Sequence, residues 1–237
     1  MHPDVVRLLE LQDKDLALLE VDTRLAEAQA EVDKLDAAIQ EVAVKAETSR
    51  GAAAEAARRR DELEAKVESY RRIQDRRRQR LEITRPTKEA ASLMAELDLS
   101  RSVLAKEEGE WAKAGDQAID LAAAADQAVL AIEEARRAQG PERDALAQKI
   151  EAIEAERAKA VAARDAAAAP VEKSLRQRYE RLRNSRPTRV VVALDGVACG
   201  ACYTAVPLNR RSQIRAGERV DWCEACGVIL YASEQHS

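Results

Sequence analysis

The stretch "ITRPTKEAASL", Ile83 to Leu93, interrupts a long run of charged and aliphatic residues and decides how the chain folds back. Pro86 disfavours the helical conformation at Arg85, and Thr87 is of a type that caps a helix beginning at Lys88. One helix therefore ends here and another begins a few residues later. Two long helices joined by so short a connection are expected to pack as an antiparallel hairpin.

The residues before this turn follow a heptad repeat that runs from Leu11 almost to the proline. Sixteen of its 22 a and d positions are apolar, which is typical of a coiled-coil seam. The seam is weakest from Ala46 to Arg60 and from Gln74 to Arg77. The a positions are Leu11, Leu18, Leu25, Val32, Ile39, Ala46, Ala53, Arg60, Val67, Gln74 and Leu81, and the d positions are Lys14, Val21, Ala28, Leu35, Val42, Ser49, Ala56, Leu63, Tyr70, Arg77 and Thr84.

A second heptad follows the turn, and its apolar periodicity continues to Asn184. Each arm of the hairpin is expected to hold roughly 80 residues and to measure about 120 Å at 1.5 Å per residue. The main seam positions are Leu97, Leu104, Trp111, Ala118, Ala125 and Ile132, followed by Leu146, Ile150, Ile153, Val171, Leu175 and Leu182.

A second interruption, "RRAQGPERD", places Gly140 where a helix commonly ends and Pro141 where one commonly begins. We interpret it as a kink near 139–141, because a hairpin tip there would leave arms of very unequal length. A tip at 139–141 instead of 84–88 is the alternative.

Composition agrees with long helices and argues against a bulky globular core. The 237 residues include no Phe, and 35% of them are charged. No run of about twenty apolar residues is present, so no membrane span or membrane partner is expected. The beginning, "MHPDVVRLLELQDKD", lacks the order of a secretory signal, and we expect a cytoplasmic protein.

Charge alternates along the chain in four zones. Residues 1–57, 58–88, 89–170 and 171–237 carry net charges of −7, +6, −7 and +4. The two basic zones are where an anionic partner is expected to bind. For residues 58–88 there is an alternative, because the opposite arm would bring carboxylates for interhelical ion pairs.

The pattern changes after "NSRPTR". "RVVVAL", Arg189 to Leu194, and the later "GVILYA" are typical of short strands, and together they predict a small β module. We therefore divide the chain into a coiled-coil hairpin, 1–184, and a C-terminal module, 185–237. A module this small normally needs a covalent or metal staple.

All four cysteines of the chain lie in that module, within "CGACYTAVPLNRRSQIRAGERVDWCEACG". Cys199, Cys202, Cys223 and Cys226 form two Cys-x-x-Cys pairs, a spacing typical of a four-cysteine zinc site. Four thiolates complete a tetrahedron and leave no open position, so we predict one structural Zn²⁺. Disulfides fit a reducing compartment poorly, and a redox-active pair would need a βαβ context that is missing.

Arginines surround the cysteine pairs and recur in the first basic zone. Phosphate binding is one interpretation, and a solvated face with charges opposing helix dipoles is the other. The candidate nucleic-acid-binding residues are Arg210, Arg211, Arg215, Arg219, Arg186 and Arg189, with Arg76, Arg77 and Arg78 near the turn.

No catalytic constellation is present in the sequence. It has no glycine-rich phosphate loop, no nucleophile elbow and no interior histidine that would act as a base. We expect neither enzymatic activity nor a small-molecule substrate.

The tail closely resembles the C4-type zinc ribbon family of bacterial proteins, in which a coiled-coil hairpin precedes a terminal ribbon. The similarity lies in "YERLR", the two cysteine pairs, "VPL" after the first pair, and Cys226-Gly227 followed by "ILY". The segments "LLELQDKDLALLEVDTRL" and "TRPTKEAASLMAEL" are similar to the family's coiled coil. Two departures, Ala201 for Gly and Val228 for a basic residue, remove no metal ligand, but the second weakens a transfer of nucleic-acid binding to this ribbon.

The resemblance also bears on function, although most members of the family have no assigned one. It is linked to nucleic-acid binding and, in flagellated bacteria, to control of flagellar genes through RNA or a sigma factor. Together with the basic zones, the resemblance favours our hypothesis of a non-enzymatic zinc-ribbon adaptor that binds RNA or DNA through basic patches. The alternative is a coiled-coil scaffold or chaperone for a regulatory protein such as a sigma factor.

Overall fold

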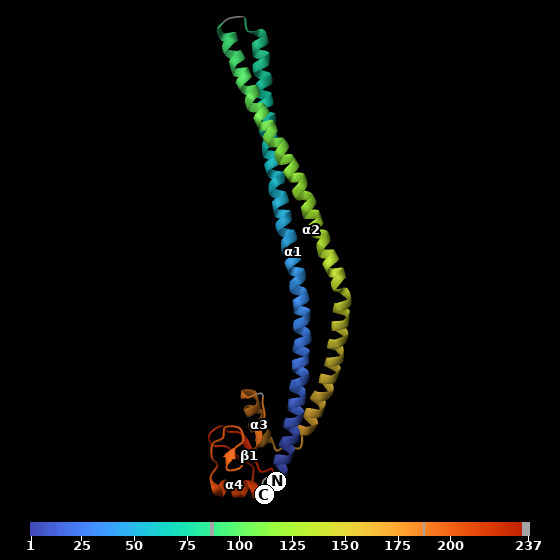
Figure 1. Cartoon of the computed structure of the whole chain (residues 1–237), viewed down its shortest axis with the longest axis vertical. Helices are drawn as coiled ribbons and strands as arrows, with labels where there is room; N and C mark the ends of the chain where they lie inside the picture. Colours follow the sequence, from blue (N-terminus) through green and yellow to red (C-terminus); the bar gives the residue numbers. More distant parts are fainter. Residues whose placement is uncertain (86–87, 187, 234–237) are drawn as a thin grey trace. The chain divides into compact units, whose positions relative to one another are not determined.

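The computed structural model describes residues 1–85, 88–186 and 188–233, and in this part of the chain four helices and four short strands are found (Figure 1). The long helices α1, Pro3–Ile83, and α2, Lys88–Ala168, hold 81 residues each. They are followed by α3, Lys173–Ser185, and by a small sheet with one further helix. The predicted fold class, a long helical hairpin followed by a small β part, is confirmed.

The chain divides into two compact units. The base unit comprises Met1–Val32 and Arg143–Ser237, and the outer unit comprises Asp33–Glu142. Each unit contains a part of both long helices, and the base unit also holds α3 and the sheet.

In the outer unit the predicted seam of α2 is the buried one. Leu97, Leu104, Ala118 and Ala125, all predicted seam positions, are at most 8% exposed. On α1 the a-position residue Val67 is 2% exposed. The heptad period in the sequence therefore identified the packed face of this unit.

Ion pairs join the two helices in the basic zone near the turn. Lys66 pairs with Glu107 at 3.7 Å and Arg71 with Glu108 at 2.6 Å. Further toward the turn, Arg77 pairs with Glu96 at 3.6 Å and Arg80 with Glu89 at 3.2 Å. The interhelical pairs considered in the sequence analysis are thus present, and each contributes little on its own because it is exposed.

The turn lies where the sequence predicts it, since α1 ends at Ile83 and α2 begins at Lys88. Thr84 closes the last turn of α1 by donating its N–H to the Leu81 carbonyl at 3.2 Å. The expected roles of Pro86 and Thr87 concern residues outside the described ranges.

The second interruption does not end a helix. α2 continues through Gly140 and Pro141, so the helix end expected at Gly140 is not observed. A proline inside a helix lacks the N–H that would bond to the fourth preceding carbonyl, at a cost of about 3 kcal/mol. Packing along the rest of so long a helix outweighs this local cost.

The second arm ends earlier than the periodicity indicates, at Ala168 instead of Asn184. Pro170 follows at once, and a proline disfavours helical geometry at the residue before it. Glu172 then caps α3 by accepting from the N–H groups of Ser174 and Leu175, both at 3.0 Å.

A hydrophobic cluster ties α3 and the sheet to the beginning of α1. Tyr179 of α3 is 1% exposed and lies in this cluster with residues of both long helices. Its buried members are Val5, Leu8, Leu11, Ala167, Ala168, Val171, Tyr179, Val190, Val191 and Ile229.

The sheet has the strand order β2-β1-β4-β3. β1, Val191–Asp195, pairs in parallel with β4, Ile229–Tyr231, and antiparallel with β2, Ala198–Cys199. β3, Asp221–Trp222, pairs antiparallel with β4. The two apolar runs read as strands in the sequence therefore lie at the centre of the sheet.

Between β2 and β3 lies helix α4, Leu208–Ala216, which the sequence analysis did not anticipate. Its C-terminal end carries a usual signal, Gly217 at the C-cap in the left-handed region with φ 70°, whereas Pro207 at the N-cap provides no side-chain hydrogen bond. Ile214 is 5% exposed and packs the helix onto the second buried cluster, which surrounds the cysteines.

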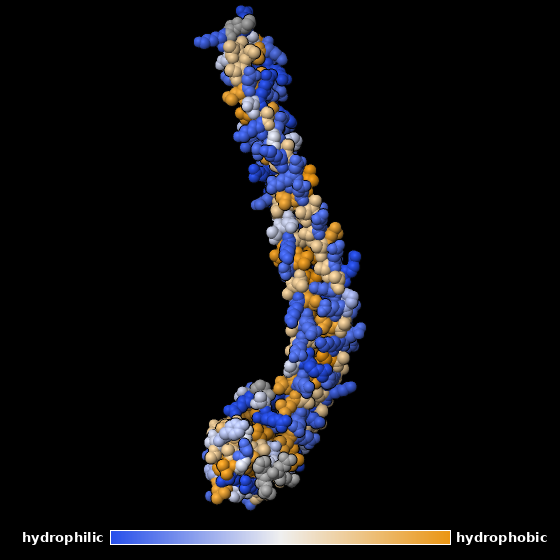
Figure 2. Space-filling model, in the orientation of Figure 1, coloured by the Kyte–Doolittle hydropathy of each residue, from blue (hydrophilic) through white to orange (hydrophobic). Residues whose placement is uncertain are grey.

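In the described ranges, none of the helices combines the length and the apolar character that a bilayer crossing requires. Figure 2 shows why: hydrophilic residues cover most of the visible face, and hydrophobic residues appear in separate patches.

Candidate metal centre and its basic surroundings

Two turns of the sheet bring the four cysteines together. Cys199 ends β2 and Cys202 lies in the turn after it, whereas Cys223 follows β3 and Cys226 lies in the turn before β4. The two cysteine pairs, separated by α4 in the sequence, therefore meet across the sheet.

Their sulfur atoms are arranged as a metal site requires. The Sγ atoms of Cys199 and Cys226 are 3.8 Å apart, those of Cys202 and Cys223 are 3.6 Å apart, and all four lie within 4.8 Å of one another. A tetrahedron with metal–sulfur bonds of about 2.3 Å has edges of about 3.8 Å. A disulfide would need about 2.05 Å, so the four thiols are free. The cluster is compatible with zinc binding, as the sequence predicts.

The thiols differ in their surroundings. Burial raises the pKa of Cys199, to about 12, and that of Cys226. Hydrogen bonds from the hydroxyl and backbone N–H of Thr204 lower the pKa of Cys202, to about 6. A divalent metal bound here would deprotonate the thiols, so that four thiolates would hold it.

The backbone of the first turn approaches both a sulfur and a neighbouring strand. The N–H of Ala201 donates to Cys199 Sγ at 3.4 Å, and the N–H of Gly200 donates to the Ala193 carbonyl at 3.2 Å. A Cβ atom at position 200 would lie 2.5 Å from that carbonyl oxygen. Gly200 is therefore needed for close packing, whereas Gly227 in the second turn has φ 79°.

We call residues 188–233 the ribbon. We predict that Gly200→Ala lowers the free energy of unfolding of the ribbon by about 1–3 kcal/mol, because the added Cβ would clash with backbone that cannot move aside. Faster transfer of metal to a chromophoric chelator would measure the effect. Gly51→Ala is the matched control: nothing lies within 4 Å of its Cβ position in α1, and a gain of about 0.5–1 kcal/mol is expected there. Equal chelation rates for Gly200→Ala and the wild type would contradict the prediction.

Arg210 fixes the second cysteine turn. Its Nε and Nη2 atoms donate to the Asp221 carboxylate at 2.9 and 2.5 Å, Nη2 also reaches the Trp222 carbonyl at 2.6 Å, and Nη1 pairs with Glu224 at 2.5 Å. The side chain is only 16% exposed. Burial alone would raise the pKa of Asp221, but the hydrogen bonds from Arg210 and the Trp222 N–H lower it. Of the predicted nucleic-acid-binding arginines, Arg210 is thus the one bound most firmly within the protein.

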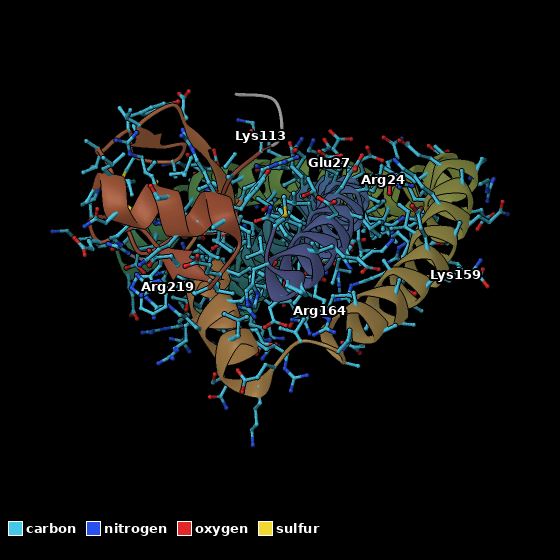
Figure 3. The ribbon with its side chains drawn as sticks, turned by 90° about the horizontal axis from the view of Figure 1, so that it is seen from below. Arg24, Glu27, Lys113, Lys159, Arg164 and Arg219 are labelled. Carbon is cyan, nitrogen blue, oxygen red and sulfur yellow. The ribbon has the colours of Figure 1, made fainter. Side chains whose placement is uncertain are left out.

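The other candidate arginines of the tail are more accessible. Arg219, labelled in Figure 3, is 55% exposed and lies 3.6 Å from Asp221. Arg215 donates to the Gly196 carbonyl at 3.5 Å, and Arg211 is half-buried. Arg186 and Arg189 are exposed, and neither pairs with a carboxylate of the described residues.

The three candidates near the turn lie in the outer unit. Arg77 is held by its pair with Glu96, whereas Arg76 and Arg78 are exposed without an ion pair to a described carboxylate. The candidates therefore form two separate groups, one in each unit.

Two polar residues of α1 that the sequence analysis passed over hold the elements that follow α2, Gln12 through the ribbon and Asp15 through α3. The Gln12 Oε1 atom accepts from the N–H groups of Val190 and Val191 at 2.8 and 2.7 Å, and its Nε2 donates to the Val191 carbonyl at 3.0 Å. Asp15, 3% exposed, accepts from the Tyr179 hydroxyl at 2.7 Å.

Two arginines complete the surroundings of Asp15. Arg164, labelled in Figure 3, and Arg183 each lie 3.2 Å from its Oδ1 atom. Burial, together with the carboxylate, raises the pKa of Tyr179, so the phenol remains a donor. We call Gln12, Asp15, Arg164, Tyr179 and Arg183 the base latch.

A second feature missed from the sequence is an aromatic residue beside the metal centre. Trp222 is 39% exposed, and the guanidinium carbon of Arg178 lies 3.7 Å from the centre of its ring. The position next to Cys223 was the only available signal.

The fold is shared with proteins of known structure. No protein-family model and no curated protein sequence matches this chain. The solved structure of CT398 from Chlamydia trachomatis matches with a TM-score of 0.83 at 17% identity, covering 97% of this chain and 98% of that one. A Mycobacterium smegmatis protein matches with a TM-score of 0.64 at 22% identity, and the HP0958 protein from Helicobacter pylori with 0.56 at 16%, each covering 97% of both chains.

At these identities the likeness establishes the fold and nothing more. A long hairpin followed by a small terminal module is an arrangement found in three bacterial species. Membership in the zinc ribbon family remains a prediction from the tail.

Proposed function

We propose that the protein is a non-enzymatic zinc-ribbon adaptor that binds nucleic acid through a basic surface on α3 and the linker after it. One Zn²⁺ held by Cys199, Cys202, Cys223 and Cys226 would fold the ribbon. Four protein ligands leave no position for a reacting water, which supports a structural role for the metal.

The observation that carries the proposal is the charge of residues 173–189, which include seven basic residues and one acidic residue. Arg176 and Arg183 face inward, to the Ala168 carbonyl and to Asp15. The remaining five basic residues have no ion pair with a described carboxylate, and we call them the α3 basic surface: Lys173, Arg178, Arg181, Arg186 and Arg189. Such a surface attracts phosphates and releases their counterions.

The test is the salt dependence of binding to a labelled RNA or DNA oligonucleotide, measured by fluorescence anisotropy. Reversing four charges, at Lys173, Arg181, Arg186 and Arg189, to Glu is expected to lower affinity more than about 100-fold and to flatten the salt slope by roughly 3. Arg210 is left unchanged, because a glutamate there would face Asp221 and Glu224 and unfold the ribbon.

The matched control reverses four exposed arginines of the outer unit, Arg58, Arg59, Arg76 and Arg78. The change in net charge is the same, so a general electrostatic effect would appear in both variants. A larger loss in this control than in the α3 variant would refute the proposed surface. Absence of any binding to RNA or DNA at low salt would refute the nucleic-acid function itself.

A second candidate function, a scaffold for a protein partner, is favoured by apolar side chains exposed on α2 in the outer unit. Leu99 and Ile119 are each 68% exposed, and Leu130 is 63% exposed. Binding through such residues would persist at high salt, whereas phosphate binding would not.

A further inference from the structure

A groove of about 330 Å³ lies beside the cysteine cluster, next to the α3 basic surface. Its lining includes the apolar side chains of Val206, Pro207 and Trp222, the polar side chains of Thr204, Arg210 and Glu224, and the predicted metal ligand Cys223. These residues lie in the loop after β2, at the start of α4, at the end of β3 and in the cysteine turn that follows β3.

Trp222 links this groove to the α3 basic surface. The indole lines the groove, and Arg178 of α3 contacts its ring. An accessible aromatic ring next to cationic side chains is the combination on which single-stranded nucleic acids stack their bases.

The charges around the groove indicate that a nucleic-acid backbone would lie on its α3 side and not over the cysteine turns. Arg210 already binds the two nearest carboxylates, Asp221 and Glu224. With one Zn²⁺ bound, the four thiolates would give the centre a net charge of about −2, which would disfavour phosphates directly over the cysteine turns. The α3 side offers Arg178 and Arg181, neither of which has an ion pair with a described carboxylate.

We infer that the groove receives one unstacked base of a single-stranded nucleic acid, which stacks on Trp222 while the adjoining phosphates contact the α3 basic surface. This inference rests on the proposed function and narrows it, because a base within a duplex is already stacked and paired and cannot enter the groove. The inference gives Arg178 two roles: its guanidinium holds the Trp222 indole in place, and its charge attracts the phosphates of the nucleic acid.

The experiment uses the full-length chain and two labelled probes, a 12-nucleotide single-stranded RNA and a duplex of the same sequence. Trp222→Ala is expected to weaken binding of the single strand at least about tenfold, and Trp222→Phe, which keeps an aromatic ring, to recover most of the loss. Zinc content and circular dichroism identify any variant that fails to fold. If Trp222→Ala fails to fold, Trp222→Phe still provides the test.

A second readout reports the indole directly. The chain has two tryptophans, so Trp111→Phe leaves Trp222 as the sole tryptophan, which can be excited selectively over the four tyrosines. Its emission is expected to be quenched by the single strand and unaffected by the duplex. The matched Trp222→Phe variant keeps only Trp111, which lies in the outer unit. Its emission is expected to stay unchanged with either probe.

The outcomes separate the inference from the function beneath it. Salt-dependent binding that is equal for Trp222→Ala and the wild type, or equal for single strand and duplex, overturns the base-binding groove and leaves the proposed function standing. No binding of either probe overturns both. Loss of a salt-insensitive protein partner in Trp222→Ala, without RNA binding, would assign the groove to a peptide and likewise overturn the inference.

Discussion

Replacing Cys223 by Ser is expected to abolish metal binding and to unfold the ribbon, residues 188–233, while the outer unit stays helical. The ribbon has seven residues in its own buried cluster, and two of them, Cys199 and Cys223, are predicted metal ligands. Structural zinc contributes on the order of 10–16 kcal/mol in finger peptides, far more than so small an apolar cluster provides. Metal analysis should give one zinc per wild-type chain and almost none in the variant.

Hydrogen exchange locates the unfolding. Amides of β1 and β4 should lose protection in Cys223→Ser, whereas the seam around Leu97 and Leu104 should keep it. Ala201→Ser is the control, since it alters an exposed non-ligand in the other cysteine turn. Less than half an equivalent of zinc in freshly purified, reduced wild-type protein would contradict the assignment of the site.

Local signals in the sequence were sufficient for the hairpin and the metal cluster. The buried positions Leu97, Leu104, Ala118 and Ala125 all lie on one seven-residue repeat, so one helix face could be identified without knowing its partner. The Cys-x-x-Cys spacing likewise places each pair of sulfurs in one turn, whatever surrounds it.

The base unit could not be derived in this way, because its contacts join residues far apart in the sequence. Lys14 was placed on the seam by the heptad and is exposed, whereas its neighbour Asp15 is buried. Gln12 and Asp15 are three residues apart on one face of α1, where Gln12 bonds to Val191 of the ribbon and Asp15 bonds to Tyr179 of α3. A heptad describes packing between two helices only, so it fails where a third element covers the helix.

The arginines of the tail illustrate a second limit. Clustering of Arg210, Arg211, Arg215 and Arg219 in the sequence indicated one basic patch. In the structure Arg210 is bound to Asp221 and Glu224, and Arg219 lies within ion-pair distance of Asp221. Counting charge along the chain does not distinguish a cation that binds a partner from one that neutralises a neighbouring carboxylate.

Replacing Asp15 by Ala is expected to release α3 and the ribbon from α1. The substitution removes a single acceptor that serves Tyr179, Arg164 and Arg183. Because it leaves a buried hydroxyl and partly buried cations without their partner, we expect it to lower the free energy of unfolding of the base unit by about 3–5 kcal/mol. Hydrogen exchange at the amides of α3 and of Val190 and Val191 would measure the loss.

Two further variants test whether the effect belongs to the base latch. Asp13→Ala removes an exposed carboxylate two residues away and should leave exchange unchanged. Asp15→Asn keeps an acceptor for Tyr179 but removes the charge that faces the arginines, so its effect should lie between those of the other two. Zinc content should remain near one per chain in all three, because the cysteine cluster is held by the sheet and not by α1. If Asp15→Ala and Asp13→Ala exchange at the same rate, Asp15 does not hold α3 and the ribbon, and the Gln12 hydrogen bonds and the apolar cluster around Leu8 account for their attachment.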